Sequence, residues 1–324
     1  MRPRVANAWQ PTASMANLRR RAALLAKIRA FFAARGVWEV ETPALSTAAT
    51  TDPALDSYRI APRGEPPRYL HTSPEFPMKR LLAAGSGDIY QLARVFRPRE
   101  QGRYHNPEFT LLEWYRLGFD DAELMAEVAE LVAAVLAPGP PPSVERLTYR
   151  EAFTRFAGVD PFAEPGALEQ RAVAVGIHPP PLPTDDPDPW RHLLMSHLVE
   201  PHLGTNGLCF ITDYPASQAA LARLRPADPG AAARFELYWQ GVELANGFWE
   251  LCNVAEQRRR FAADLRQRRR HGLTVAPCDH RLLAALEAGL PDCAGVALGV
   301  DRLAMLVMAC DHLDQVLAFP QQRA

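Results

Sequence analysis

The sequence contains few cysteines, and none of them lies close to another. The five cysteines, at positions 209, 252, 278, 293 and 310, form no Cys-x-x-Cys motif. Zinc sites and disulfide-stapled domains usually show such close spacings, so neither kind of site is indicated here. Reduced thiols in a cytoplasmic enzyme are the simplest interpretation.

The sequence also lacks long apolar runs and an excess of charge. No run approaches the roughly 20 apolar residues of a transmembrane helix, and residues 1–11 lack the apolar core of a signal peptide. We therefore expect no membrane partner. The net charge is −1, whereas a protein that binds many RNA phosphates normally has more Lys and Arg than acids. This balance argues against nucleic acid as a partner.

The most informative stretch is a predicted β-hairpin with a long polar tip. Residues 89–96 and 109–115 form apolar strands, and the tip between them is rich in Arg, Glu, His and Asn. Hairpin loops usually need only about two to five residues, so this longer tip suggests function. Arg97 ends the first strand, while Glu113 and Tyr115 share one face of the second. Such groups suit a substrate with phosphate, carboxylate and amine groups, although a solvated surface hairpin fits the composition equally well.

The N-terminal part predicts a helix followed by a strand. Apolar residues recur at the helical period over residues 17–35, with Asn17 as N-cap and Gly36 as the terminating residue. Residues 38–41 then alternate like a strand that stops at Pro43. Farther on, Ser73 and Pro74 suit a helix start, and Glu75 in the first turn is favoured by the helix dipole. Capping alone could therefore explain Ser73 and Glu75.

The middle of the chain predicts a helix over 120–136 and then a proline-rich region. Residues 137–205 are interpreted as a connector or insertion, with a capping box at Thr148 and Glu151 and a helix over 190–203. His192, His197 and His202 do not fall on one helical face, which argues against a metal site. Strands are predicted over 208–215, 235–239 and 242–251, and Asn253 caps an arginine-rich helix.

Two further patterns are weak by themselves. Glu243 and Glu250 are seven residues apart around an Asn-Gly pair, and they could converge on Mg²⁺ if the chain bends between them. Near the C-terminus a strand, Gly299 and a helix follow in order. Arg302 lies in the first turn of that helix, where backbone N–H groups favour phosphate.

These stretches together resemble the class II aminoacyl-tRNA synthetases. Residues 97–116 are similar to motif 2 of lysyl-tRNA synthetases, residues 17–45 to motif 1, and residues 299–303 to motif 3. Residues 102–109 and 215–222 are closer still to the elongation factor P–(R)-β-lysine ligases, which are related to these synthetases. The motifs occur in the class II order and span nearly the whole chain.

The resemblance implies an α+β fold of the class II synthetase type, with an antiparallel sheet flanked by helices. Residues 1–324 would form a single catalytic domain, with 137–205 as its insertion, and the motif 1 helix would form a homodimer interface. Motif 1 begins within the first twenty residues, so we expect no anticodon-binding domain and no tRNA. The implied acceptor is a lysine ε-amino group of elongation factor P.

The implied reaction is activation of (R)-β-lysine by ATP with Mg²⁺, followed by transfer from the adenylate. Arg97 and Arg302 would be the catalytic residues, on the α- and γ-phosphates. The implied substrate-binding residues are Ser73, Pro74, Glu75, Tyr115, Glu250 and Ala297. The implied ATP-binding residues are Arg97, Pro98, Arg99, Glu100, Asn106, Glu243, Leu244, Gly299 and Arg302. Glu243 and Glu250 would carry the metal, although Glu250 could serve a substrate amine instead.

The sequence departs from lysyl-tRNA synthetases at two of these positions. Those enzymes commonly have an acid two residues after the first arginine, whereas this chain has Arg99 there and Glu100 next. Ala297 stands where they usually have glycine, so the substrate pocket should differ by at least a methyl group. The alternatives are an enzyme that activates α-lysine or charges tRNA, and a non-catalytic synthetase paralogue. The presence of both Arg97 and Arg302 disfavours the paralogue.

Overall fold

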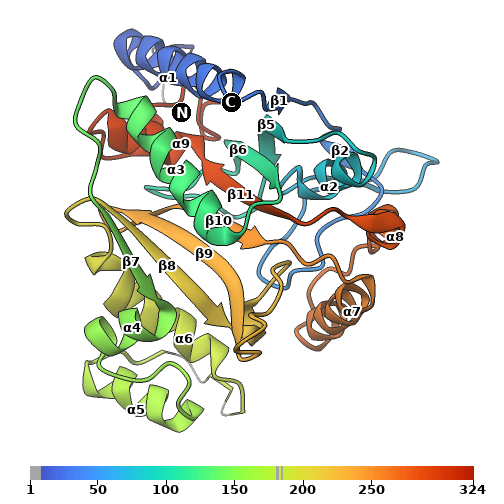
Figure 1. The fold of residues 1–324 in the computed structure, drawn as a ribbon, viewed down its shortest axis with the longest axis vertical. Helices are drawn as coiled ribbons and strands as arrows, with labels where there is room; N and C mark the ends of the chain where they lie inside the picture. Colours follow the sequence, from blue (N-terminus) through green and yellow to red (C-terminus); the bar gives the residue numbers. More distant parts are fainter. Residues whose placement is uncertain (1–8, 180–181, 184) are drawn as a thin grey trace, which may run out of the picture.

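A computed structural model describes residues 9–179, 182–183 and 185–324. Its centre is an eight-stranded sheet (Figure 1). In spatial order the strands are β1 (Trp38–Glu39), β5 (Ile89–Phe96), β6 (Glu108–Leu117), β11 (Cys293–Gly299), β10 (Val242–Trp249), β9 (Ala231–Trp239), β8 (Leu208–Pro215) and β7 (Val144–Thr148).

The sheet is antiparallel through its six central strands, as predicted, but parallel at both ends. β1 pairs with β5, and β7 pairs with β8, in parallel. Parallel neighbours need a long crossover connection, and each of these pairs is separated in sequence by about fifty or more residues. The sheet is therefore mixed.

One face of the sheet is covered by three helices around the main hydrophobic core (Figure 1). Phe32, Trp114, Val128 and Phe235 are buried in this core. The second strand of the hairpin, β6, sends Leu112 and Trp114 into it. The covering helices are α1 (Met15–Ala33), α3 (Asp121–Leu136) and α9 (Val300–Val307).

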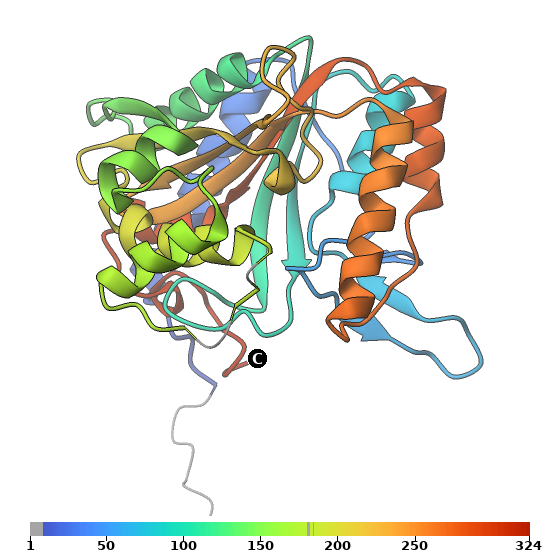
Figure 2. The ribbon, with the colours of Figure 1, turned by 90° about the horizontal axis from the view of Figure 1, so that it is seen from below.

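The other face of the hairpin packs on a second helical layer, seen beside the strands in Figure 2. Ile89 and Tyr115 join its separate hydrophobic cluster, which also contains Met78, Phe261 and Leu282. Because side chains alternate along a strand, Glu113 lies on the same side as Tyr115. The helices of this layer are α2 (Glu75–Ala83), α7 (Val254–Arg270) and α8 (His280–Gly289).

The helix starts are mostly near the predicted positions, with two shifts. Helix α1 is capped by Ser14, whose side chain accepts from the backbone N–H of Asn17, so the prediction of Asn17 as the cap was wrong. The Asn17 amide instead donates to the Gln315 carbonyl at 3.0 Å. Pro74 is the N-cap of α2 and not its first helical residue. Asn253 caps α7 as predicted, accepting from the Glu256 N–H at 3.0 Å.

The insertion packs its own apolar cluster against β8, separate from the main core. The Thr148–Glu151 capping box is confirmed, but the single helix predicted over 190–203 is broken, and Pro201 cannot continue an α-helix because it has no N–H. The segments are α4 (Tyr149–Ala152), the π-helical turn Phe153–Ala157, α5 (Pro165–Ala174), α6 (Asp188–Leu194), the π-helical turn Met195–Val199 and the 3₁₀ turn Glu200–His202.

Part of the region 46–67, which reads as loop in the sequence, belongs to a small second sheet. It consists of β2 (Leu45–Ser46), β4 (Arg68–Leu70) and β3 (Arg59–Ile60). Two further 3₁₀ turns are Ala216–Gln218 and Leu313–Gln315. Among the described residues, no helix combines the length and apolar character that crossing a bilayer requires.

Candidate active site

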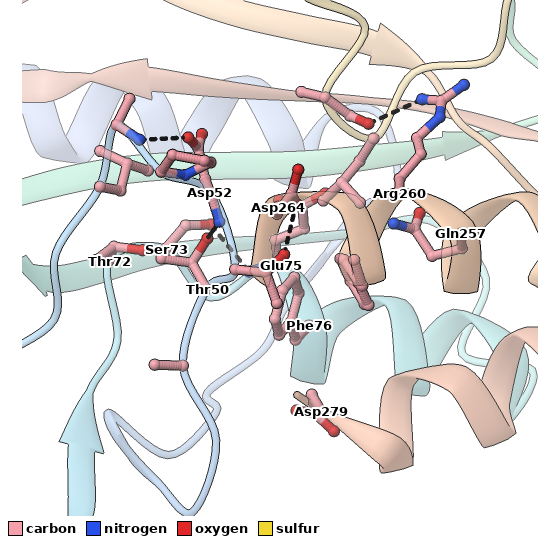
Figure 3. A pocket seen from close by; sticks show the side chains of 18 of the residues that line it. Thr50, Asp52, Thr72, Ser73, Glu75, Phe76, Gln257, Arg260, Asp264 and Asp279 are labelled. Carbon is pink, nitrogen blue, oxygen red and sulfur yellow. Dashed lines mark hydrogen bonds between the residues drawn. The ribbon is translucent and has the colours of Figure 1, made fainter. Parts of the chain in front are cut away.

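A cavity of about 1110 Å³ lies between the hairpin, α2 and α7 (Figure 3). Several predicted substrate residues line it, together with Arg97 from the first hairpin strand's end. The predicted residues on its wall are Ser73, Glu75, Arg97, Tyr115, Glu250 and Ala297. Residues 137–205, which the sequence suggests are a connector or insertion, also reach this wall through Asp186, Asp188 and His192.

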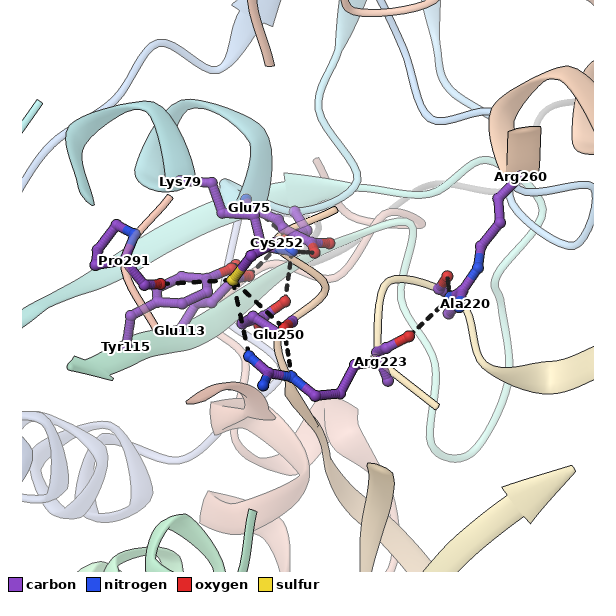
Figure 4. A network of polar contacts seen from close by, with 12 residues as sticks. Glu75, Lys79, Glu113, Tyr115, Ala220, Arg223, Glu250, Cys252, Arg260 and Pro291 are labelled. Carbon is purple, nitrogen blue, oxygen red and sulfur yellow. Dashed lines mark hydrogen bonds and ion pairs between the residues drawn. The ribbon is translucent and has the colours of Figure 1, made fainter. Parts of the chain in front are cut away.

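One end of the cavity is built around the buried ammonium of Lys79 (Figure 4). Its Nζ lies 2.6 Å from Glu75 Oε1 and 2.6 Å from Glu250 Oε2. Lys79 is four residues after Glu75 on α2, so both side chains lie on one helical face. Burial alone would lower the pKa of Lys79, but the Glu250 and Glu75 carboxylates raise it above the ordinary lysine value. Lys79 is therefore charged.

A third carboxylate, Glu113, completes this polar cluster. Its two oxygens accept hydrogen bonds from the Ser73 hydroxyl at 2.6 Å and the Tyr115 phenol at 2.7 Å. Burial raises the pKa of Glu113 to about 7, with a further contribution from Glu75, against the opposing effect of these hydrogen bonds. Burial likewise raises the pKa of Glu250 to about 8, although the Lys79 ammonium opposes the rise. The cluster therefore contains three acidic groups but only one ammonium to balance them.

Strand β11 supplies the floor of this end. Ala297 lies opposite Glu113 on one neighbouring strand and Asn246 on the other. At Gly295, a Cβ atom would lie 2.3 Å from Tyr115 Cε1 and 2.6 Å from Glu250 Oε1. Only glycine leaves room there for the Tyr115 ring and the Glu250 carboxylate.

The hairpin tip turns its residues in two directions. Arg97 donates to the Thr72 carbonyl at 3.3 Å, and its guanidinium lies 3.7 Å from Glu100 Oε1. Arg99 has a left-handed backbone with φ of 69° and pairs with Asp56, away from Arg97. The side chain of Arg99 is 76% exposed, whereas that of Glu100 is 28% exposed. Glu100 therefore takes the inner position, and Arg99 the outer one.

Arg302 is held by the hairpin tip and β10. Its guanidinium donates to the Tyr104 carbonyl at 3.1 Å and the Glu243 carbonyl at 2.8 Å, and it lies 2.7 Å from His105 Nε2. Burial and the Arg302 charge lower the pKa of His105, so the neutral ring can accept from the arginine. These contacts place motif 2 and motif 3 against each other.

The remaining predicted ATP residues have differing surroundings. The Asn106 amide is engaged by the protein: it donates to the Glu108 carbonyl at 2.6 Å and accepts from the Gln321 N–H at 3.0 Å. Pro98 follows β5 in the hairpin turn. A Cβ at Gly299 would make only ordinary contacts, the nearest at 3.7 Å, with Leu244 O at 3.8 Å. The packing of the protein around position 299 therefore does not require a glycine there.

Strand β10 separates Glu243 from Glu250. It spans residues 242–249, with a bulge between Glu243 and Ala245, and extended residues rise about 3.3 Å each. Glu250 faces Lys79 at one end of β10, and Glu243 faces Arg302 at the other. Glu243 instead has Glu236 of β9 as its acidic neighbour, since that carboxylate raises the pKa of Glu243 in addition to burial.

The comparisons with known proteins agree with this architecture. A family model described as tRNA synthetases class II (D, K and N) matches residues 1–323. The chain belongs to the class II tRNA synthetase family. Among its curated relatives, proteins of Vibrio cholerae serotype O1, Vibrio vulnificus and Sodalis glossinidius are each named elongation factor P–(R)-β-lysine ligase. They are 54%, 52% and 49% identical over 322, 319 and 322 residues. These matches cover 98%, 96% and 98% of this chain, and 98% of each relative.

This class II synthetase site contains residues that the predicted substrate-binding and ATP-binding sets do not include. Lys79 lies four residues after Glu75 and pairs with it. It is also one of only two lysines in the sequence, with Lys27, and these two features could have identified Lys79 as a candidate. Glu113 shares a strand face with Tyr115, which hints at its position but not at its hydrogen bonds. Gly295 and Glu236 give no comparable signal, because only the sheet register brings them to the site.

Three of the sequence's other polar candidates have structural explanations. His197 contacts the Leu193 carbonyl at 2.9 Å, and His202 stacks on Phe156. Within the described ranges, no cluster of three or more His, Cys, Asp or Glu residues is arranged to hold a metal ion by itself. Arg268 of α7 is buried and pairs with Asp56 at 2.6 Å. It therefore ties α7 to the loop that precedes β3.

Proposed function

We propose that the protein is an ATP-dependent, AMP-forming ligase that activates (R)-β-lysine and transfers it to a lysine ε-amino group of elongation factor P. The observation that carries this proposal is the charge balance of the Lys79 cluster. Two carboxylates, Glu75 and Glu250, pair with one ammonium, and Glu113 lies beside them, bound by Ser73 and Tyr115. The cluster has a net charge of −2 when all three acids are ionised. A substrate with two ammonium groups would supply the missing charge.

The first step would be adenylate formation. The substrate carboxylate attacks the α-phosphorus of ATP, an oxygen–phosphorus bond forms, and the bond to the departing pyrophosphate breaks. No general base is needed, because the carboxylate is already ionised at neutral pH. Arg97 lies on the cavity wall and would neutralise charge on the α-phosphate, while Arg302 would hold the γ-phosphate.

The nucleotide end offers carboxylates that suit Mg²⁺. The side chain of Glu243 is 42% exposed and lies 3.3 Å from an Arg302 nitrogen, with Glu236 nearby. Oxygen donors of this kind, together with phosphate oxygens, are the ligands that Mg²⁺ prefers. We assign the metal to Glu243 and the substrate amine to Glu250, because the Glu236 oxygens already accept hydrogen bonds from Arg234, Tyr214 and Tyr238. When bound, Mg²⁺ would neutralise phosphate charge during pyrophosphate release.

The remaining nucleotide residues would position ATP. Glu100 occupies the inner side of the hairpin tip near Arg97, so we assign the predicted acidic contact to Glu100 and a loop-anchoring role to Arg99. Pro98 would shape the turn, and Asn106 would hold the tip in place through its two hydrogen bonds. The backbone at Leu244 and Gly299 would border the nucleotide between β10 and β11.

The amine pocket would orient the substrate. Glu75, Glu250 and Tyr115 would receive its two amines, with Ser73 and Pro74 shaping the start of α2. Ala297 would narrow the pocket by a methyl group, which favours a substrate other than α-lysine. In the second step, the unprotonated acceptor amine attacks the adenylate carbonyl, a C–N bond forms, and AMP leaves.

The acceptor and the assembly are part of the same proposal. The names of the curated relatives support elongation factor P as the acceptor, and the net charge of −1 supports a protein in place of tRNA. We propose a cytoplasmic homodimer of single catalytic domains, with α1 and β1 at the interface. Trp38 of the sheet-edge strand β1 is 63% exposed, as an interface residue of a separated subunit would be.

The proposal is tested by pyrophosphate exchange with ATP, comparing (R)-β-lysine, α-lysine and a monoamino acid of the same length. The expected order of kcat/KM is (R)-β-lysine, then α-lysine, with the monoamino acid near background. Preference for α-lysine together with tRNA charging would support the alternative synthetase activity. Absence of exchange with every substrate would support a non-catalytic paralogue.

A further inference from the structure

Lys79 is an unusual residue in this chain for two reasons. It is only 2% exposed, and it is one of just two lysines beside an abundance of arginines. The other lysine, Lys27 on α1, is exposed and donates to the carbonyls of Val135 and Ala137. Lysine carries a compact point charge, whereas arginine carries a broad planar fork. The compact ammonium lies between Glu75 and Glu250, 2.6 Å from an oxygen of each.

The surroundings of Lys79 come from four elements. Glu75 is on the same helix, α2, while Glu113 and Tyr115 come from β6. Glu250 and Cys252 follow β10, and Cys293 begins β11. The guanidinium of Arg223 lies on the far side of Glu250, where it donates to the Glu250 backbone carbonyl at 3.0 Å and to Cys252 Sγ at 3.7 Å. Lys79 is the cation that pairs with the Glu75 and Glu250 carboxylates themselves.

Both carboxylates that contact Lys79 are proposed ligands of the substrate amines. The Lys79 Nζ lies 2.6 Å from Glu75 Oε1 and 2.6 Å from Glu250 Oε2, so these two ion pairs fix the position of both carboxylates relative to α2. Removing one member of a buried pair leaves the other charge uncompensated, and the usual response is protonation of the remaining acid. A protonated Glu250 can no longer accept an ammonium as an ion pair.

We propose that Lys79 is a positioning residue that aligns the Glu75 and Glu250 carboxylates for the two amines of the diamino-acid substrate and favours the ionised form of Glu250. This role rests on the proposed function, because it assigns the two amines to these carboxylates. Lys79 itself contributes no contact to the reacting atoms. Its ammonium opposes the uptake of a proton by Glu250.

The test compares Lys79→Met, Lys79→Arg and the matched control Lys27→Met. For Lys79→Met, the acid limb of the kcat/KM profile for the diamino acid should move upward by about one pH unit or more, because Glu250 then needs a higher pH to ionise. Its KM at pH 7 should rise about tenfold or more, with the KM for ATP changed by less than about twofold. Lys79→Arg should keep the acid limb, and Lys27→Met should leave the profile unchanged.

If Lys79→Met impairs every kinetic parameter to the same extent and leaves the pH profile unmoved, Lys79 has a purely structural role and the proposal is overturned. If Lys79→Met does not fold, the double variant Lys79→Met/Glu250→Gln tests the proposal in its place. It removes both charges, so it should recover a folded state with a cooperative thermal unfolding transition. A double variant that also fails to fold would overturn the proposal.

A spectroscopic measurement separates this inference from the proposed function. Lysine-selective isotope labelling gives only two side-chain signals, and Lys27→Met assigns them. The Lys79 signal should report a charged ammonium throughout pH 6–9 and should shift in Glu250→Gln and Glu75→Gln. A neutral amine in that range, or insensitivity to both variants, would contradict the proposed ion pairs even if the enzyme activates no diamino acid.

Discussion

Replacing Gly295 by alanine should close the amine pocket. The added Cβ would lie 2.3 Å from Tyr115 Cε1, about 1.1 Å closer than the 3.4 Å at which ordinary contact begins. The Tyr115 ring is 2% exposed and its hydroxyl is anchored to Glu113 at 2.7 Å, so it cannot move aside freely. Overpacking of this kind costs about 1–3 kcal/mol of folding free energy.

The expected functional effect is larger for the substrate than for ATP. Displacing the ring breaks the Tyr115–Glu113 hydrogen bond, and hydrogen bonds to charged groups contribute about 1.5–3 kcal/mol. The KM for the diamino acid should therefore rise about 10- to 100-fold, with little change in the KM for ATP. Steady-state pyrophosphate exchange measures both constants, and thermal unfolding measures the stability cost.

Gly166→Ala is the matched control. A Cβ there meets nothing within 4 Å, and the residue lies in α5 of the insertion. Alanine should leave stability equal or raise it by about 0.5–1 kcal/mol, because glycine is the poorer helix former. A Gly295→Ala enzyme with wild-type stability and an unchanged KM for the diamino acid would refute the packing of the pocket described above.

Three further predictions concern the same site. Glu113→Gln should raise the KM for the diamino acid about tenfold or more, measured by pyrophosphate exchange, because Ser73 and Tyr115 lose a charged acceptor; an unchanged KM would remove Glu113 from the pocket. Arg302→Ala should lower the adenylation rate about 100-fold in single-turnover assays, and an unchanged rate would overturn its assignment to ATP. Without substrate, stability should fall as pH rises from about 5 to 8, by at most about 1.4 kcal/mol per pH unit for each proton. The native pKa values of Glu113 and Glu250, about 7 and about 8, exceed the ordinary 4.5, so the folded state binds more protons in that window. Thermal unfolding of Glu250→Gln should show a shallower slope, and an identical slope would contradict the shifted pKa.

The sequence predicts local elements well where hydrophobic periodicity and capping agree. Strand β8 has the predicted ends, and α3 differs from its prediction by one residue, because Asp120 caps it through a full capping box. The hairpin strands β5 and β6 also agree, since their apolar alternation is strong. The single helix predicted over 190–203 is wrong for two reasons: the chain after Leu194 widens into a π-helical turn that shares an apolar cluster with β8, and Pro201 then stops the α-helical pattern.

The chemistry of the site is less predictable because it depends on register between distant strands. Spacing in sequence suggests that Glu243 and Glu250 share an ion, but an extended strand separates residues by about 3.3 Å each. The acidic neighbour of Glu243 is Glu236, across the β9–β10 pair, and only the sheet reveals it. Lys79 shows the same limitation, since its partner Glu250 is 171 residues away.

The most direct test of the central claim is intact-mass analysis of purified elongation factor P after incubation with the enzyme, ATP, Mg²⁺ and (R)-β-lysine. The account predicts addition of one β-lysyl group to a single lysine of the factor, dependent on ATP and abolished by Arg302→Ala. Unmodified elongation factor P in a reaction that activates the amino acid, or transfer to tRNA instead, would contradict it.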